Sequence, residues 1–312
     1  MKDQILGLHH ITAIAGDAQR NHDFYSRVLG LRFLKKTVNF DDPGTYHFYF
    51  GDEIGSAGTI LTFFPWSHVH AGRRGPGQAT EIGYSVPAGS FDFWMKRFDE
   101  HGVTYSKPAE KFGEPYLTFL DPDGLKLELT VSKTPDPRTP WTTAEVGPAV
   151  ALRGFHHVTL TLASAKATAQ ILTEVFGYTL QEQHVNRFRY ATDAVPGAAA
   201  LVDLVEAPGE SPAVTAGGTV HHVAFRVPDD ATLLRFREII VRRGLSITPQ
   251  IDRQYFHSLY FREPGGVLFE IATDNPGFMV DEPLAELGTH LLLPPQHEAR
   301  RAQIEAHLPV IR

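Results

Sequence analysis

The sequence predicts an α+β fold built from four copies of one module, in which a strand is followed by a helix and three further strands. Three observations support this prediction. A histidine doublet opens a strand pattern three times, predicted helices end at comparable glycines, and two turn-forming segments precede strands of matching pattern. The doublets are His9-His10, His156-His157 and His221-His222.

Modules one and three begin alike. Module one is expected at about residues 6–64, with Asp17 as the candidate N-cap of its helix and Gly30 at the C-terminal cap. Module three has Ser164 and Gly177 at the corresponding places. The two segments therefore read as repeats of one unit.

Modules two and four finish alike. Asp121–Gly124 and Glu263–Gly266 are predicted turns, and each leads into a strand of alternating apolar residues. The alternation puts Glu128 and Glu270 at equivalent positions on the face opposite the apolar one. Because one matches three and two matches four, the chain looks like a duplicated pair of modules.

These repeats predict the domain organisation. We expect a first pair of modules at 1–131, a proline-rich linker at 132–153, a second pair at 154–274 and a tail at 275–312. The tail contains a helical pattern at about 296–307.

Composition excludes several classes of protein. With 42% hydrophobic and 21% charged residues, the 312-residue chain is typical of a globular protein. Its net charge of −7, without a basic run, argues against nucleic acid or a membrane surface as partner. The absence of cysteine excludes disulfides, thiolate metal sites and a cysteine nucleophile.

Two further expectations concern location. Residues 1–4 lead directly into a strand pattern, which argues against a signal peptide, and no apolar stretch approaches the ~20 residues of a transmembrane helix. The expected location is the cytoplasm.

The second histidine of each doublet is a candidate metal ligand, because strand alternation turns it away from the apolar face. Two imidazoles and a carboxylate on one side of a metal form the facial triad of non-haem Fe(II) oxygenases. If modules pair in chain order, the triad is His157, His222 and Glu270. If module one pairs with four, His10 replaces His157. Hydrogen-bonded core polar groups are the plain alternative.

The pattern resembles the vicinal oxygen chelate superfamily, which includes glyoxalase I, bleomycin-resistance proteins and extradiol dioxygenases. The resemblance covers roughly residues 6–274 and implies four βαβββ modules paired into two cup-shaped domains. More narrowly, the chain is similar to ring-cleaving dioxygenases that act on hydroquinones. The segments that carry the narrower resemblance are Leu8–Thr12, Leu34–Asn39, Val220–Phe225 and Leu291–Pro295.

This resemblance implies His10, His222 and Glu270 as metal ligands, and hence the pairing of module one with four. It implies Fe(II), alternatively Mn(II), as cofactor, and a small aromatic molecule and O2 as substrates. A homo-oligomer stays open as a further partner, since the sequence does not reveal the oligomeric state. Polar groups that would orient ligands or substrate are implied at His9, Thr12, His221, Arg253 and Tyr260.

The same pairing leaves modules two and three together. Their equivalent positions hold Glu81, Glu128 and His157. We expect a vestigial, metal-free site there, with a second metal as the alternative.

Two other functions remain open at this point. The first is a glyoxalase-like isomerase or lyase, which would favour a further carboxylate ligand. Module one is expected to have Phe63 at the place that matches Glu270, so that ligand is missing. The second is a non-catalytic resistance protein that binds an aromatic compound or quinone and does not need the triad.

Overall fold

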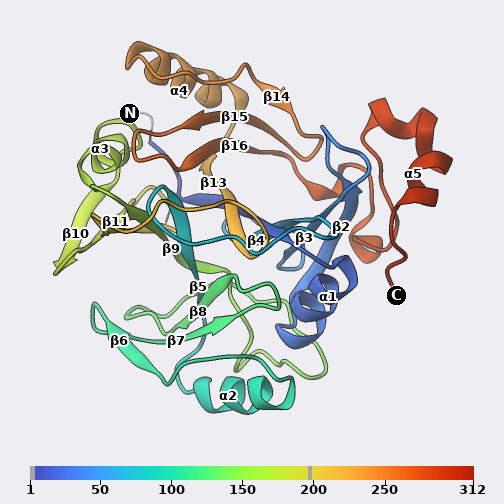
Figure 1. Ribbon diagram of the computed structural model, residues 1–312, viewed down its shortest axis with the longest axis horizontal. Helices are drawn as coiled ribbons and strands as arrows, with labels where there is room; N and C mark the ends of the chain where they lie inside the picture. The colour runs from blue at the N-terminus through green and yellow to red at the C-terminus, as the bar shows by residue number, and fades with distance from the viewer. Residues whose placement is uncertain (1–3, 196–198) are drawn as a thin grey trace.

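The computed structural model describes residues 4–195 and 199–312, and these residues form two eight-stranded sheets (Figure 1). Residues 1–3, on which the expectation about a signal peptide partly rests, lie outside the described residues. The first sheet has the order β14-β15-β16-β13-β1-β4-β3-β2, so that it contains modules one and four. Its strands are β1 (Leu8–Ala15), β2 (Arg32–Val38), β3 (Tyr46–Gly51), β4 (Ile60–Pro65), β13 (Thr219–Val227), β14 (Ile251–Asp252), β15 (Phe256–Arg262) and β16 (Leu268–Pro276).

The second sheet contains modules two and three, in the order β10-β11-β12-β9-β5-β8-β7-β6. The predicted pairing of module one with four is thereby confirmed, as is the α+β fold of two cups. The strands of the second sheet are β5 (Gln78–Ser85), β6 (Ala109–Lys111), β7 (Glu114–Leu120), β8 (Lys126–Thr130), β9 (Phe155–Leu162), β10 (Thr179–His184), β11 (Arg187–Ala191) and β12 (Leu201–Glu206).

The helices cover the sheets and supply the apolar core. In Figure 1, α2 (Phe91–Glu100) lies outside β7 and β8, and α4 (Asp230–Arg242) lies outside β15 and β16. The ring of Phe98 in α2 packs 4.7 Å from that of Phe119 in β7. Burial of such large rings is the main stabilising term for this layer, at about 1.5–3 kcal/mol per side chain.

The helices of modules one and three share an unusual form. α1 (Ala18–Asp23) continues as the π-helical turn η1 (Phe24–Val28), and α3 (Lys166–Gln170) continues as η2 (Ile171–Val175). Both end before glycines with positive φ, 69° at Gly30 and 80° at Gly177, as predicted for C-terminal caps.

The two predicted N-caps differ in outcome. Asp17 caps α1 by accepting a hydrogen bond from the backbone N–H of Arg20 at 2.7 Å, as expected. Ser164 is not the N-cap of α3, because the helix begins one residue later, after Ala165. The carboxylate of Glu206 takes over, accepting the Ala165 N–H at 2.8 Å. A side chain from another strand therefore replaced the local cap.

The tail packs against module one. The Leu292 N–H donates to the carbonyl of Lys36 at 3.0 Å, and the fully buried Lys35 donates to the Glu282 carboxylate at 2.6 Å. The helical pattern predicted at about 296–307 is a 3-10 segment followed by an α-helix. The tail elements are η3 (Phe278–Val280), η4 (Leu284–Glu286), η5 (Pro295–Arg300) and α5 (Arg301–His307).

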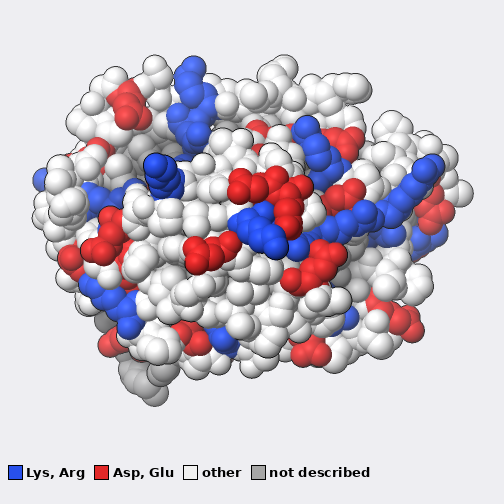
Figure 2. All heavy atoms as spheres, turned by 90° about the horizontal axis from the view of Figure 1, so that it is seen from below, with Lys and Arg blue, Asp and Glu red and all other residues white. Residues whose placement is uncertain are grey.

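The segment 132–153, which was expected to be a linker, is fully described and has neither helix nor strand. Each sheet contains one module from before that segment and one from after it. The sheets therefore do not divide the chain at this segment, and the bounds of the domains stay a prediction. Among the described helices, none has the length and apolarity that crossing a bilayer requires. On the face shown in Figure 2, basic and acidic side chains lie side by side, so this face presents no broad basic surface for phosphates.

Candidate metal centre

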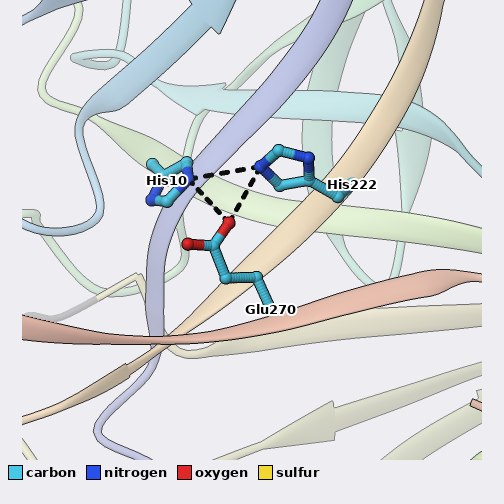
Figure 3. A group of neighbouring side chains, drawn as sticks. All are labelled: His10, His222 and Glu270. Carbon is cyan, nitrogen blue, oxygen red and sulfur yellow. Dashed lines mark hydrogen bonds and ion pairs between the residues drawn. The ribbon is translucent and has the colours of Figure 1, made fainter. Parts of the chain in front are cut away.

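Three buried donor side chains converge from three neighbouring strands (Figure 3). β1 and β13 run antiparallel with His10 opposite Ala224, and β13 and β16 run parallel with Ala224 opposite Glu270. The Oε2 atom of Glu270 lies 3.1 Å from Nε2 of His10 and 2.9 Å from Nε2 of His222. The two Nε2 atoms are 3.4 Å apart.

This spacing fits a divalent metal. Donors at right angles around a metal with bonds of ~2.1 Å lie ~3.0 Å from one another, close to the separations here. The Oε2 atom of Glu270 is buried without a hydrogen-bond partner among the described residues, whereas Oε1 accepts from the Ser258 hydroxyl. Burial raises the pKa of Glu270, but His10 and His222 outweigh it and hold that pKa well below its usual range. Oε2 of Glu270 is therefore a negatively charged oxygen whose lone pairs are available to a metal ion.

The first histidine of each doublet orients the second. Nδ1 of His9 lies 2.9 Å from Nδ1 of His10, and Nδ1 of His221 lies 2.8 Å from Nδ1 of His222. Burial, then the adjacent imidazole, lowers the pKa of His9 and of His221 to about 3, so both rings are neutral near pH 7. A neutral ring can accept the Nδ1–H of its neighbour, which leaves the Nε2 lone pair of that neighbour for a metal.

A cavity of about 270 Å³ opens beside the two candidate histidine ligands. Of the polar residues implied at the site, His221, Arg253 and Tyr260 line it, whereas His9 and Thr12 do not. Aromatic rings form much of its wall. The lining residues are His10, Asn39, Phe40, Asp41, His47, Tyr49, Phe64, Trp66, His221, His222, Arg253, Phe256, Tyr260 and Leu268.

Arg253 and Tyr260 act as a pair at this wall. Nε of Arg253 donates to the Tyr260 hydroxyl at 3.3 Å, and its guanidinium lies 5.2 Å from the Tyr260 ring centre. Burial, then the Glu270 carboxylate, raises the pKa of Tyr260 well above its usual value. The phenol is therefore protonated near pH 7 and can donate a proton or a hydrogen bond.

His47 and Tyr49 are cavity residues that the sequence interpretation missed. Nδ1 of His47 and the Tyr49 hydroxyl are 2.9 Å apart, and Nε2 of His47 lies 3.0 Å from the Thr62 hydroxyl. Thr62 in turn bonds Thr12 at 2.7 Å. Thr12 is therefore connected to the cavity residue His47 by a chain of hydrogen bonds through Thr62. Alternation in β3 could have revealed this, since residues 47 and 49 share one face of the strand.

The residue of module one that matches Glu270 is Thr62, and the expectation of Phe63 is wrong by one position. Thr62 pairs with Thr12, two residues after His10, just as Glu270 pairs with the residue two after the doublet of module four. Phe63 points to the other face, where its ring packs 4.5 Å from that of Tyr25. A hydroxyl thus stands where a further carboxylate ligand would be needed.

Glu81, Glu128 and His157 also converge, in the second sheet. The ammonium group of Lys111 lies among them, paired with Glu128, 3.2 Å from Nε2 of His157 and 3.7 Å from Glu81. Although burial and Glu128 raise the pKa of Glu81, the positive charges of Arg187, Lys111 and Lys126 lower it to about 2. This group is therefore charged and already ion-paired.

The chain is similar to known proteins over nearly its full length. The chain is 46% identical over 308 residues to the Bacillus subtilis protein named "putative ring-cleaving dioxygenase MhqO", covering 99% of this chain and 97% of the relative. It is 36% identical to the chlorohydroquinone/hydroquinone 1,2-dioxygenase of Sphingobium indicum, covering 97% and 96%.

A solved structure shares the whole architecture. The crystal structure of a "putative dioxygenase" from Bacillus subtilis superposes with a TM-score of 0.94 at 44% identity, covering 99% of this chain and 98% of that one. A family model matches residues 7–129 and 154–271. On these matches, the chain belongs to the Glyoxalase/Bleomycin resistance protein/Dioxygenase superfamily.

Proposed function

We propose that this protein is a metal-dependent ring-cleaving dioxygenase that opens a hydroquinone-type aromatic ring with O2. It would hold Fe(II), alternatively Mn(II), through His10, His222 and Glu270. The observation that supports this most is the convergence of the three donors beside an aromatic-lined cavity, with His10 and His222 at its wall. The likeness to a named hydroquinone dioxygenase over nearly the full length of both chains supplies the reaction class.

The donor set suits the proposed metal. Two imidazole nitrogens and one carboxylate oxygen on one side leave the other coordination positions for a phenolic oxygen and O2. When bound, Fe(II) would supply the electron transfer and the template that bring O2 and the electron-rich ring together.

The cavity walls favour a small flat substrate. The volume of the cavity is about 270 Å³, below the ~300–1,000 Å³ of sites for drug-sized ligands. A single substituted ring therefore fits better than a fused ring system. The rings of Phe64 and Trp66 are stacked 5.9 Å apart along the wall, and Phe40 and Phe256 add further aromatic surface. Such rings hold an aromatic substrate by offset or edge contacts.

Polar side chains then act on the substrate oxygens. Arg253 would stabilise negative charge on a phenolate, because its guanidinium lies at the cavity wall. Tyr260 would donate a hydrogen bond or a proton, since its raised pKa keeps it protonated. His47, whose pKa burial and then His10 hold well below the usual value, is neutral and would relay a hydrogen bond from Thr62 to Tyr49.

Oxygen uptake tests the proposal. The protein is reconstituted anaerobically with Fe(II) or Mn(II), and hydroquinone, chlorohydroquinone and catechol are added in air-saturated buffer. We expect one O2 consumed per ring lost with hydroquinone substrates, and no uptake by the protein stripped of metal. If the protein consumed no O2 after loading with either Fe(II) or Mn(II), that result would contradict the proposal.

The same preparation separates the rival functions. A glyoxalase-like isomerase would convert the methylglyoxal–glutathione hemithioacetal without O2, which the hydroxyl of Thr62 in place of a carboxylate disfavours. A resistance protein would bind hydroquinone or quinone without turnover, and would do so equally well without metal.

A further inference from the structure

The second cup repeats the geometry of the first with different side chains. His157 lies opposite Gly83, and Gly83 lies opposite Glu128, as His10, Ala224 and Glu270 do in the first cup. The residue two before Gly83 is Glu81, and the residue two before Ala224 is His222. One imidazole is thus exchanged for a second carboxylate.

Lys111 occupies the position that Arg253 has in the first cup. Ala109 of β6 pairs with Tyr116 as Ile251 of β14 pairs with Ser258, so that Lys111 and Arg253 both come two residues later. The next residue has positive φ in both hairpins, 51° at Phe112 and 70° at Gln254. The two basic side chains therefore enter their cups from the same place.

The ammonium group of Lys111 lies against the three donor groups that would otherwise hold a metal. It pairs with Glu128, lies 3.2 Å from Nε2 of His157 and 3.7 Å from Glu81. The Lys111 side chain is only 10% exposed, and Glu128 and His157 are buried. Two carboxylates so close together in a buried site need a cation to stay ionised.

Longer basic side chains fill the rest of the second cup. By strand register, Arg187 stands where the first cup has His47, and Arg189 stands where it has Tyr49. Arg187 donates to Glu81 at 3.0 Å, and Arg189 donates to Asp203 at 2.8 Å. In the second cup, these ion pairs occupy the space that corresponds to the cavity of the first cup.

We propose that Lys111 is the built-in cation of the second cup. Its ammonium group takes the place of a metal, so that the chain binds one metal ion, in the first cup. Removing Lys111 turns Glu81, Glu128 and His157 into a second site for a divalent cation such as Mn(II), because one imidazole nitrogen and two carboxylate oxygens suit that ion. The count of one in the wild type rests on the proposed function, whereas the gain on removing Lys111 does not.

Metal content tests the proposal. Full-length wild type and Lys111→Ala are stripped with chelator, loaded with Mn(II), desalted and measured by elemental analysis and Mn(II) electron paramagnetic resonance. We expect one Mn(II) per wild-type chain and two per Lys111→Ala chain. The matched control is Lys126→Ala, which removes a partner of Glu81 at the rim of the cup but leaves Lys111 in place, and should bind one.

Two further variants extend the test, and the first of them, which leaves Lys111 in place, keeps the proposal testable if Lys111→Ala does not fold. His157→Gln should leave the metal content of the wild type at one, and a fall would mean that the second cup already binds metal. In the Glu270→Gln background, Lys111→Ala should raise the content from none to one. A folded Lys111→Ala that gains no Mn(II), or a wild type that binds two, overturns the proposal. Failure of the proposed function would instead appear as absent oxygen uptake with this gain intact.

Discussion

Glu270 divides the work of its two oxygens at the residue scale. Oε1 accepts from the Ser258 hydroxyl, which fixes the plane of the carboxylate, and Oε2 faces the two histidines without a hydrogen-bond donor in the part of the chain that the structure describes. A carboxamide of the same shape would place a neutral oxygen or an N–H there. The negative charge, more than the shape, is therefore what the two imidazoles and a divalent ion require.

Glu270→Gln should abolish stoichiometric metal binding. The variant removes the anionic ligand, and changes even in groups that orient a ligand cost ~10–100-fold in metal affinity, so a ligand itself should cost more. The measurement is Fe(II) content after anaerobic reconstitution and desalting. The control is Glu128→Gln, the same substitution at the matching position of the second cup, which should retain the metal. Full iron and full oxygen uptake in Glu270→Gln would exclude the triad.

Tyr260→Phe should lower turnover with little change in metal content or melting temperature. Phe keeps the ring that packs 5.6 Å from His222 and loses only the hydroxyl bonded by Arg253. If the phenol transfers a proton, kcat should fall by ~10²–10⁴-fold, and a positioning role would give less. Tyr255→Phe is the control, since its hydroxyl bonds Asp281 of the tail at 3.0 Å, outside the cavity. Unchanged kinetics with a lower melting temperature would make Tyr260 a structural tyrosine.

Residue-level prediction worked where the pattern is local and failed where it is not. Alternation places His10, His222 and Glu270 on one face of their strands, but which histidine joins Glu270 depends on how modules pair, and that came from the resemblance. Nothing local indicates whether Lys111 or Arg187 folds into a cup or extends into solvent. The buried carboxylates of Glu81 and Glu128 decide it, and they lie in other strands of the second sheet.

At the scale of elements, one side chain stabilises the turn Asp121–Gly124, which leads into β8. The Asp121 carboxylate accepts from the N–H groups of Asp123 at 2.9 Å and Leu125 at 2.8 Å, and from the Tyr25 hydroxyl at 3.0 Å. Tyr25 lies in η1 of module one, so this turn also ties two modules together. Burial raises the pKa of Asp121 to about 6 despite these donors.

The raised pKa predicts a pH-dependent contribution to stability. The folded state binds a proton between about pH 4 and 6 that the unfolded state has released, so the contribution of Asp121 is fully present below about pH 4 and is lost as pH rises through 6. In the metal-free protein, the unfolding free energy of wild type relative to Asp121→Asn should fall by up to about 3 kcal/mol between pH 4 and 7. Urea unfolding at several pH values measures it.

Tyr25→Phe provides the internal check on that prediction. It removes a hydroxyl that donates to the carboxylate, so the fall relative to Asp121→Asn should grow and move to higher pH. A difference that stays constant from pH 4 to 7 would show that Asp121 does not titrate in this range.

Caps illustrate the limit of local rules for elements. Asp17 precedes α1 and its carboxylate is free to turn back onto the helix, so the sequence prediction holds. Ser164 has the same local chemistry, but Glu206 at the end of β12 accepts the N–H of Ala165, the residue before α3, and the helix begins at Lys166. A stronger acceptor from a distant strand overrides a local one.

At the scale of the whole molecule, the candidate metal centre depends on both ends of the chain. His10 comes from β1, whereas His222 and Glu270 come from β13 and β16, and the two parts meet through the antiparallel β1–β13 pair. The tail adds a second tie, because Tyr46 of β3 donates to the carbonyl of Pro309 at 2.9 Å. Neither half of the sequence holds all three donors.

Splitting the chain should therefore separate the metal ligands and reunion should restore them. Lys133, Thr134 and Pro135 are exposed, so a break after Thr134 cuts no strand. We expect the fragments 1–134 and 135–312, produced separately, to bind no stoichiometric Fe(II), because the first lacks Glu270 and the second lacks His10.

Co-expressed fragments should co-purify and regain metal and oxygen uptake, since the β1–β13 pairing and the tail contacts supply a large buried interface between them. Introducing His10→Ala into fragment 1–134 should leave co-purification intact while removing the metal. If fragment 135–312 alone bound Fe(II) and consumed O2 with hydroquinone, the donors would have to come from one half, as pairing in chain order requires through His157. Such a result would contradict both the triad and the sheet that joins module one to module four.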